Sequence, residues 1–375
     1  MKSRHSRKRW LVMTAAWLLL DVFALHSGTP LRIGMINCDL HAFYYAALFE
    51  TYDPILLRDD PVGRGHAAYY YMYMHYDDPR RMTAPRVNGL TITRVWDREP
   101  AKAENLARIF GGRPQVCRTV AEVSDNVDLV FIADCNGDGA DHLRLATPGI
   151  EKHVPTFIDK PLAADFGDAR KLVDLSRKCR TPLMSLSMLR ELPQAARFAS
   201  RFDELGAPEF AVIKGGGETL AGQIHAISLA QHLFGPGVEA VSCMGSVPLA
   251  HILLDYGNKA GKPAAGVMLS CASGGTYHAS MYASVYSRLG VIHSPPFGDF
   301  EFPWGAARIL EMAREMVRTG RSPVSDSDML ECIAVAAAAR LARQSGRKVY
   351  LSEIGLPDST VAPAETPEAN RSTRK

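Results

Sequence analysis

The sequence has little of what several common classes of protein require. Its seven cysteines are scattered over 375 residues, so there is no Cys-x-x-Cys zinc spacing and a disulfide framework is not favoured. Positive charge is not in excess either: 43 Lys and Arg face 40 Asp and Glu, which excludes a broad basic surface for nucleic acid. With 47% hydrophobic and 22% charged residues, we expect a globular chain whose cysteines are mostly buried and reduced.

A long uninterrupted apolar run is also missing. Residues 1–9 are basic, and residues 10–25 are apolar except for Thr14 and Asp21, which makes the run too short and too interrupted for a membrane span. The pattern resembles a signal peptide, and the alternative is an extended translation start, with the native sequence beginning near residue 29. We expect no stable membrane insertion and a cytoplasmic location, unless residues 1–29 are a genuine signal and the protein is periplasmic or exported.

Residues 30–160 alternate regularly between strands and helices. Apolar runs predict buried strands at 31–36, 91–96, near Val116, 128–133 and 154–158, and helices follow Asp39 and cover 101–110 and 138–147. This alternation predicts a Rossmann-type parallel sheet with helices on both faces. An irregular insertion at 59–88 interrupts it. The Tyr-rich stretch 69–76 inside the insertion is expected to pack over the sheet edge or, alternatively, to stack on sugar rings or meet a partner.

Residues 161–355 are expected to form a second α/β domain, followed by a polar, disordered tail at 356–375. Helices are predicted at 164–179, 193–204, 222–234, 305–318 and 326–343, and strands at 182–186, 209–217, 239–245, 250–256, 265–271 and 276–287. The later strands predict a large open, mainly antiparallel sheet. Because they place apolar residues on both faces, we expect the face without helices to be buried in a homo-oligomer.

Polar side chains directly follow the predicted parallel strands. They are Asn37 to His41, Asp97, Asp134 to Asn136, and the pair Asp159 and Lys160. Because ligands bind at the carboxyl ends of the strands in such sheets, these residues should converge. No metal site is expected, since His225 and His232 lie two helical turns apart and the spacing places no third ligand beside them.

Several spaced motifs together resemble one family. They are Leu31–Ile36, Val95-Trp96-Asp97-Arg98, Asp128–Ala133 with His142, Gly149–Val154 leading to Asp159-Lys160-Pro161-Leu162, Gly222–His225, and Thr319-Gly320-Arg321 with Pro323. Over about residues 31–354 the chain resembles the Gfo/Idh/MocA family, the glucose–fructose oxidoreductase and inositol dehydrogenase type. The resemblance implies hydride transfer between NAD or NADP and a small-molecule substrate, a sugar, cyclitol or related polyol.

The resemblance implies roles for individual residues. Lys160 matches the lysine beside the nicotinamide and the reacting hydroxyl, His225 matches an acid/base histidine, and Arg190 matches an arginine near the substrate. Cofactor contacts are expected from Gly34, Asn37, Asp39, Asp97, Asp134, Asn136 and Lys160. Asp97 would bind ribose hydroxyls and so favour NAD over NADP. Structural alternatives remain open: a solvated Lys160, a hydrogen-bonded helix-start His225, a helix-capping Asp97 and a salt-bridged Arg190.

The chain departs from the family pattern at two points. Asn37, Asp39 and Ala42 replace the three fingerprint glycines, and Asp39 places a carboxylate where a diphosphate is expected. Ala221 stands where an acidic residue often precedes the histidine by four positions. Two functions therefore stay open. The chain is an oxidoreductase, or it is a family member without dinucleotide turnover that binds carbohydrate, serves as a scaffold or performs non-redox sugar chemistry.

Overall fold

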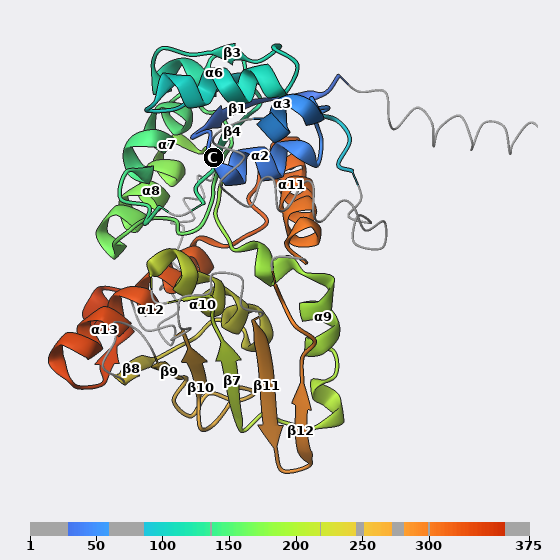
Figure 1. The fold of residues 1–375 in the computed structure, drawn as a ribbon. Coiled ribbons are helices and arrows are strands. Elements are labelled where there is room, and N and C mark those ends of the chain that lie inside the picture. Colours follow the sequence, from blue (N-terminus) through green and yellow to red (C-terminus); the bar gives the residue numbers. More distant parts are fainter. Residues whose placement is uncertain are drawn as a thin grey trace, which may run out of the picture.

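The computed structural model describes residues 29–59, 86–135, 137–217, 219–244, 251–271, 281–298 and 301–356. Most of the predicted insertion, the Tyr-rich stretch 69–76, Asn136, the signal-like residues 1–28 and the tail beyond residue 356 lie outside this part. Two sheets, each with its own helices, organise the described residues (Figure 1).

The first sheet is parallel throughout, with the order β3-β2-β1-β4-β5-β6. Its strands are β1 (Leu31–Ile36), β2 (Leu90–Trp96), β3 (Gln115–Val116), β4 (Leu129–Ile132), β5 (Thr156–Ile158) and β6 (Leu183–Met184). The connecting helices are α2 (Leu40–Ala47), α3 (Pro54–Asp59), α6 (Pro100–Ile109), α7 (His142–Glu151) and α8 (Phe166–Cys179). The predicted Rossmann-type sheet is therefore confirmed, and its last strand comes from beyond residue 160.

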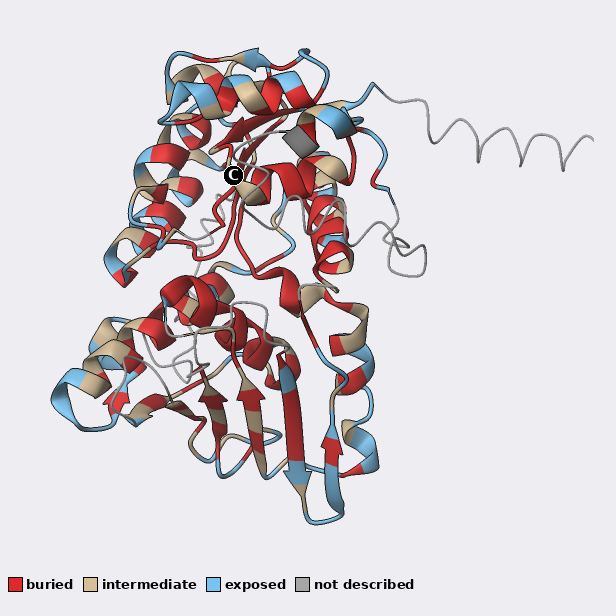
Figure 2. Ribbon diagram, in the orientation of Figure 1, coloured by how far each residue is buried: buried red, intermediate tan, exposed pale blue. Residues whose placement is uncertain are grey.

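Close packing of this sheet explains one of the glycines in the sequence. A Cβ atom on Gly34 would lie 2.2 Å from the carbonyl oxygen of Val123, in the 3-10 helix η2 (Val120–Ser124). On the opposite side of the sheet, Tyr45 of α2 packs edge-on against Phe131 of β4, with ring centroids 4.8 Å apart. Gly34 thus allows the close approach of η2 to β1. Elements on both faces cover the sheet here, and every residue of β4 is buried (Figure 2).

Helix α7 begins and ends later than the sequence predicts. Gly139 has a φ of 78°, in the left-handed region, which a right-handed helix cannot include. The chain therefore forms a loop over residues 137–141, and the helix starts at His142 and continues through Pro148. The delayed start places the His142 side chain at the carboxyl edge of the sheet.

The second sheet has the order β12-β11-β7-β10-β9-β8-β13, and only the β7–β10 pair is parallel. Its strands are β7 (Phe210–Lys214), β8 (Ala240–Met244), β9 (His251–Asp255), β10 (Val267–Ser270), β11 (Tyr282–Ser287), β12 (Gly290–His293) and β13 (Val349–Tyr350). Helices α10 (Leu220–Phe234) and α12 (Asp326–Ser345) pack against it. The predicted mainly antiparallel sheet is confirmed.

Four further segments connect the two sheets or close the fold. They are η3 (Met188–Glu191), α9 (Pro193–Ala199), α11 (Phe302–Thr319) and α13 (Leu351–Ile354). Helix α11 contacts both η3 and α2, so it links the carboxyl edge of the first sheet to the second domain (Figure 1). Within the described ranges, no helix combines the length and the hydropathy that crossing a bilayer requires.

Candidate active site

The carboxyl edge of the parallel sheet is tied together by Asp39. This residue caps α2: its Oδ1 accepts the backbone N–H of His41 at 2.9 Å. Its Oδ2 accepts the backbone N–H of Cys135 at 2.7 Å, which fastens the turn after β1 to the turn after β4. Asn37, with a φ of 63°, takes the left-handed conformation for which the family pattern has a glycine. Asp39 is thus a structural clamp between two turns of the edge.

Asp97, at the end of β2, is engaged in the same way. Its Oδ2 accepts the backbone N–H of Cys38 at 2.7 Å, and its Oδ1 accepts that of Glu99 at 2.8 Å. The residue is buried, and both oxygens bond to the protein itself. Asp97 therefore stands where the sequence predicts it, at the edge, but its bonds are those of a turn-stabilising carboxylate.

These hydrogen bonds affect whether the turn after β1 can bind the diphosphate of a dinucleotide. A fingerprint loop offers free backbone N–H groups to the diphosphate, whereas here those of Cys38, His41 and Cys135 all donate to aspartates. Asp39 adds a negative charge at the helix N-terminus where the diphosphate would lie. As folded, the residues of this turn do not fit a dinucleotide diphosphate.

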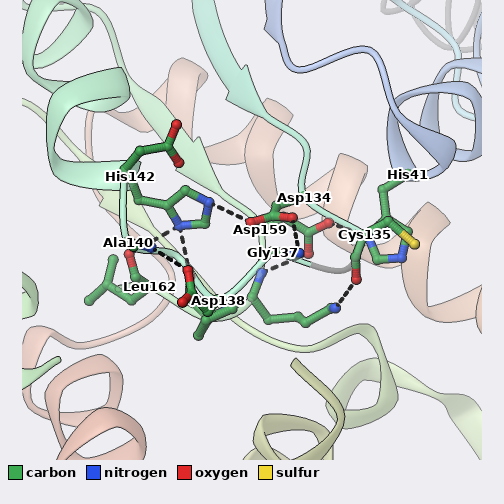
Figure 3. A network of polar contacts seen from close by, with 12 residues as sticks. His41, Asp134, Cys135, Gly137, Asp138, Ala140, His142, Asp159 and Leu162 are labelled. Atoms are coloured by element: carbon green, nitrogen blue, oxygen red, sulfur yellow. Dashed lines mark hydrogen bonds and ion pairs between the residues drawn. The ribbon is translucent and has the colours of Figure 1, made fainter. Parts of the chain in front are cut away.

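His142 and Asp134 form a buried ion pair at the same edge (Figure 3). The His142 Nε2 donates to Asp134 Oδ2 at 3.0 Å, and its Nδ1 donates to the carbonyl of Pro161 at 2.9 Å. Burial alone would lower the pKa of His142, but the hydrogen bond and the charge of Asp134 outweigh it and raise that pKa. Because both ring nitrogens donate, His142 is a cation that joins the turns after β4 and β5.

We expect His142→Ala to lower the free energy of unfolding by about 3–5 kcal/mol, because it leaves the buried Asp134 without its charged partner. The raised pKa of His142 makes its contribution complete below its unfolded value of about 6.5, and the contribution is lost as the pH rises through the folded value. Urea unfolding at pH 6 and pH 9 measures both effects. Arg144→Ala, an exposed change on the same helix, is the control and should cost under about 1 kcal/mol. Equal losses for the two variants would contradict this assignment.

His41 is a second buried histidine at this edge, and the sequence indicates it only as part of the turn after β1. Its Nδ1 lies 2.5 Å from Oδ2 of the fully buried Asp159, and the Cys135 side chain lies beside its ring (Figure 3). Burial would lower the pKa of His41, but its interactions with Cys135 and Asp159 raise it well above its ordinary value. Asp159 follows β5 and His41 belongs to α2, so only the fold reveals this pair.

Lys160 is buried with 1% of its surface exposed, and its ammonium donates to the carbonyl oxygen of Cys135 at 2.7 Å. It is therefore not the solvated lysine that the sequence left open. Lys160 also lines a small cavity of about 20 Å³, with room for about one water molecule, between the parallel sheet and helices α10 and α12. Further residues on this cavity wall are Ser187, Arg190, Ser228, Gln231 and Asp328.

His225 lies in the first turns of α10, with 6% of its surface exposed. Its Nδ1 is 2.6 Å from the Ser187 hydroxyl, and its ring stacks on Phe302 of α11. Burial, and then the positive charges of Lys160 and His41, lower the pKa of His225 well below its ordinary value. The sequence does not indicate Ser187 as a site residue, yet its hydroxyl is the group that bonds to the His225 ring. Ala221, one helical turn before His225, has no polar side chain that could make this bond.

Arg190, in η3, is held by the second domain. Its guanidinium donates to Oε1 of Gln231 at 2.8 Å and lies 3.9 Å from Asp328 of α12. Arg190 thus has the salt bridge that the sequence left open and also lines the cavity, and its contact with a substrate stays a prediction. Among the described residues, no group of three His, Cys, Asp or Glu side chains is suited to hold a metal ion.

Comparison with known proteins agrees with this fold. Residues 62–185 match the family model GFO_IDH_MocA, described as an oxidoreductase family with an NAD-binding Rossmann fold. No curated protein matches the chain. A myo-inositol 2-dehydrogenase from Lactobacillus plantarum is similar in structure at 13% identity, with a TM-score of 0.65 over 86% of this chain and 99% of that one. GenD2 from gentamicin A biosynthesis, solved with NAD, is similar at 17% identity, with a TM-score of 0.64 over 87% and 97%.

The resemblance to Gfo/Idh/MocA proteins that the motifs predicted is thus confirmed. Residues 62–185 match the model of the NAD-binding oxidoreductase family, and the structural neighbours share the fold over most of this chain. The match begins at residue 62, after β1 and the turn that lacks the fingerprint glycines. The turn after β1, where a diphosphate would bind, therefore lies outside the matched segment.

Proposed function

We propose that this chain acts as an oxidoreductase on a hydroxyl group of a sugar, cyclitol or related polyol, bound between the two domains. The proposal is carried by one observation: Lys160, Ser187 and His225 come from separate segments and meet beside one cavity. The family match supports the reaction type. The substrate hydroxyl would lie between the Lys160 ammonium and the His225 ring.

The two residues have complementary tasks. A positive charge at Lys160 favours the alkoxide form of a nearby hydroxyl, and so eases loss of its proton. His225 is held neutral by burial and by the charge of Lys160, and a neutral imidazole can accept that proton. Because Ser187 occupies Nδ1, the other ring nitrogen, Nε2, is the one left to face a substrate.

The turn after β1 favours a second candidate function. Asp39 and Asp97 take up the N–H groups that a diphosphate needs, so the same polyol site would serve binding or proton-transfer chemistry without a dinucleotide. In that case Lys160 and His225 move protons on a carbonyl or hydroxyl carbon of a sugar, and no hydride leaves.

Cofactor titration separates the two candidates. NADH fluorescence should change on addition of the protein if the first function holds, with NADH bound more tightly than NADPH because Asp97 repels a 2′-phosphate. Turnover on a panel of inositols, sugars and their keto forms then identifies the substrate. Absence of binding by either cofactor would leave the second function, and tighter binding of NADPH would overturn the preference for NAD.

We further propose a homo-oligomer formed through the outer face of the second sheet. Tyr282 and Tyr286 of β11 lie on one face and are 48% and 40% exposed, whereas Ala283 and Val285 between them are buried on the helix-covered face. Their neighbours in register on β7 are Lys214 and Phe210, so the two rows continue each other. Large aromatic side chains on an open sheet face are typical of an interface.

Light scattering at micromolar concentration should therefore give a mass of at least two chains. The double variant Tyr282→Asp with Tyr286→Asp should shift the mass toward the single-chain 41.1 kDa. Lys171→Asp, an exposed change on α8 of the other domain, serves as the control. A wild-type mass near 41.1 kDa would refute this interface.

A further inference from the structure

A groove lined by residues of η3, α9, α10 and α11 is not used by the proposed function. Segment η3 contacts each of the three helices, and the four elements lie together beside the junction of the domains (Figure 1). The groove has a volume of about 360 Å³, within the range of about 300–1,000 Å³ that small-molecule sites occupy. Neither Lys160 nor His225 lines it. Its histidine is His232, seven residues after His225 and therefore about 10 Å further along α10.

Trp304 of α11 supplies an aromatic surface in this groove. Its side chain packs against the hydrophobic core and remains partly exposed. Among the described residues, no aromatic ring stacks on the indole and no acceptor bonds to its N–H group. Leu192, Pro193 and Ala307 also line the groove, so part of its wall is apolar. A partly exposed indole in such a wall is suited to stack on the apolar face of a ring and to donate one hydrogen bond.

The charged side chains of the groove are paired with one another. Arg190 Nε lies 3.4 Å from Glu191 Oε1, and Arg308 Nη1 lies 3.0 Å from Glu311 Oε2. The two positive and two negative charges cancel, so a charged ligand would bring a charge without a partner. Both pairs keep N–H groups and oxygen lone pairs that can bond to neutral hydroxyl groups. The groove therefore favours an uncharged, polar ligand.

His232 adds a neutral hydrogen-bonding group to the wall. Burial, and then the positive charge of Arg190, lower the pKa of His232 below its ordinary value. Within the part of the chain that the structure describes, its ring nitrogens bond to no other residue. A neutral imidazole offers one donor and one acceptor, which is what a hydroxyl group can use in either direction.

We propose that this groove binds one ring of a neutral saccharide, which stacks on Trp304 and bonds through its hydroxyl groups to His232 and the two ion pairs. A saccharide ring has apolar C–H faces and a circumference of hydroxyl groups, each of which can donate and accept. A purely apolar ligand would leave the polar groups of the wall without water and without partners. This inference goes beyond the proposed function, because binding in the groove needs neither a dinucleotide nor the reactive pair.

Saturation-transfer NMR of the full chain tests binding with methyl β-D-glucopyranoside, methyl β-D-galactopyranoside, methyl α-D-mannopyranoside and cellobiose. We expect at least one of these sugars to bind, and its Kd is then measured by titration. D-sorbitol, which has the hydroxyl groups but no ring, should bind at least about fivefold more weakly, because it offers no rigid face to the indole. Absence of binding by all four sugars would overturn the proposal and leave the groove to another part of the chain or to a second copy.

Variants of Trp304 place the bound sugar. Trp304→Ala should raise the Kd at least about fivefold, whereas Tyr350→Ala, which removes an exposed aromatic ring of β13, should not. The chain has four tryptophans, so the sugar should change its intrinsic fluorescence. Trp304→Phe should abolish that change and Trp96→Phe should retain it. An unchanged Kd in Trp304→Ala, or loss of the fluorescence change in Trp96→Phe alone, would overturn the proposed site.

The charge of the ligand is tested with D-glucuronate. Wild-type protein should bind it at least about fivefold more weakly than methyl β-D-glucopyranoside, because its carboxylate finds no unpaired cation in the groove. Glu311→Gln frees Arg308 and should narrow or reverse this difference. Equal wild-type affinities for the two compounds would overturn the assignment of a neutral ligand, and an unchanged ratio in Glu311→Gln would remove the Arg308–Glu311 pair from its role.

The outcome can be separated from that of the proposed function. Lys160→Met changes the reactive pair and should leave the Kd of the sugar in the groove unchanged. If Lys160→Met weakens sugar binding and Trp304→Ala does not, the sugar lies at the reactive pair, which overturns this inference and supports the proposed function. No arm of the test uses turnover or NADH, so a protein without dinucleotide chemistry would still show binding in the groove.

Discussion

Lys160→Met is expected to lower turnover of the polyol substrate at least about a hundredfold. The change keeps the apolar stem, whose packing it preserves, and removes the charge that favours the alkoxide. Loss of a general acid–base or charge-stabilising group typically costs this much. Lys171→Met, in which an exposed lysine of α8 is changed in the same way, is the matched control and should leave turnover unaltered.

His225→Asn should lower turnover by a similar factor while cofactor affinity, where a cofactor binds, changes far less. His225 contacts Ser187 and Phe302 on the second-domain side. Ser187→Ala separates positioning from proton transfer: it removes the bond to Nδ1 and should lower kcat more than it raises KM. Ordinary turnover in both Lys160→Met and His225→Asn would show that the protein does not use this pair.

The edge of the sheet could be predicted from the sequence because strands in a parallel sheet end on the same side. Apolar runs located the ends of β1, β2, β4 and β5, and the polar residues after them do meet. The bonds among these residues could not be predicted. A local sequence pattern does not predict that Asp39 bonds to Cys135, 96 positions later in the chain, or that His41 bonds to Asp159, 118 positions later.

The partner of His225 was missed for a related reason. The sequence pattern directs attention to position 221, one helical turn before the histidine on the same helix. The actual partner, Ser187, lies in the segment before η3, and α11 supplies Phe302 from the opposite side. Contacts between elements that are far apart in the chain depend on how the two domains pack. The spacing of residues along one helix carries no information about that packing.

Asp39→Gly is expected to raise NADH affinity at least about tenfold, whichever of the two functions the wild-type protein has. The change restores the residue type of the family fingerprint, removes a negative charge at the start of α2, and frees the N–H groups of His41 and Cys135. Coulomb repulsion between Asp39 and a diphosphate and competition for these N–H groups both disappear. Fluorescence titration with NADH measures the gain, and the loss of the clamp should lower the free energy of unfolding by about 1–3 kcal/mol.

Two matched variants identify which property of Asp39 excludes the diphosphate. Asp39→Asn removes the charge and keeps one acceptor oxygen for a backbone N–H, so a gain close to that of Asp39→Gly would assign the exclusion mainly to repulsion, and a much smaller gain to the N–H group that remains occupied. Asp53→Gly removes a comparable cap from the N-terminus of α3, where Asp53 accepts the N–H groups of Ile55 and Leu56, and should leave NADH affinity unchanged. If Asp39→Gly remains folded and its NADH affinity is unchanged, Asp39 is not the residue that excludes the dinucleotide. Asp97, which still accepts the N–H groups of Cys38 and Glu99, and the rest of the turn would then be responsible.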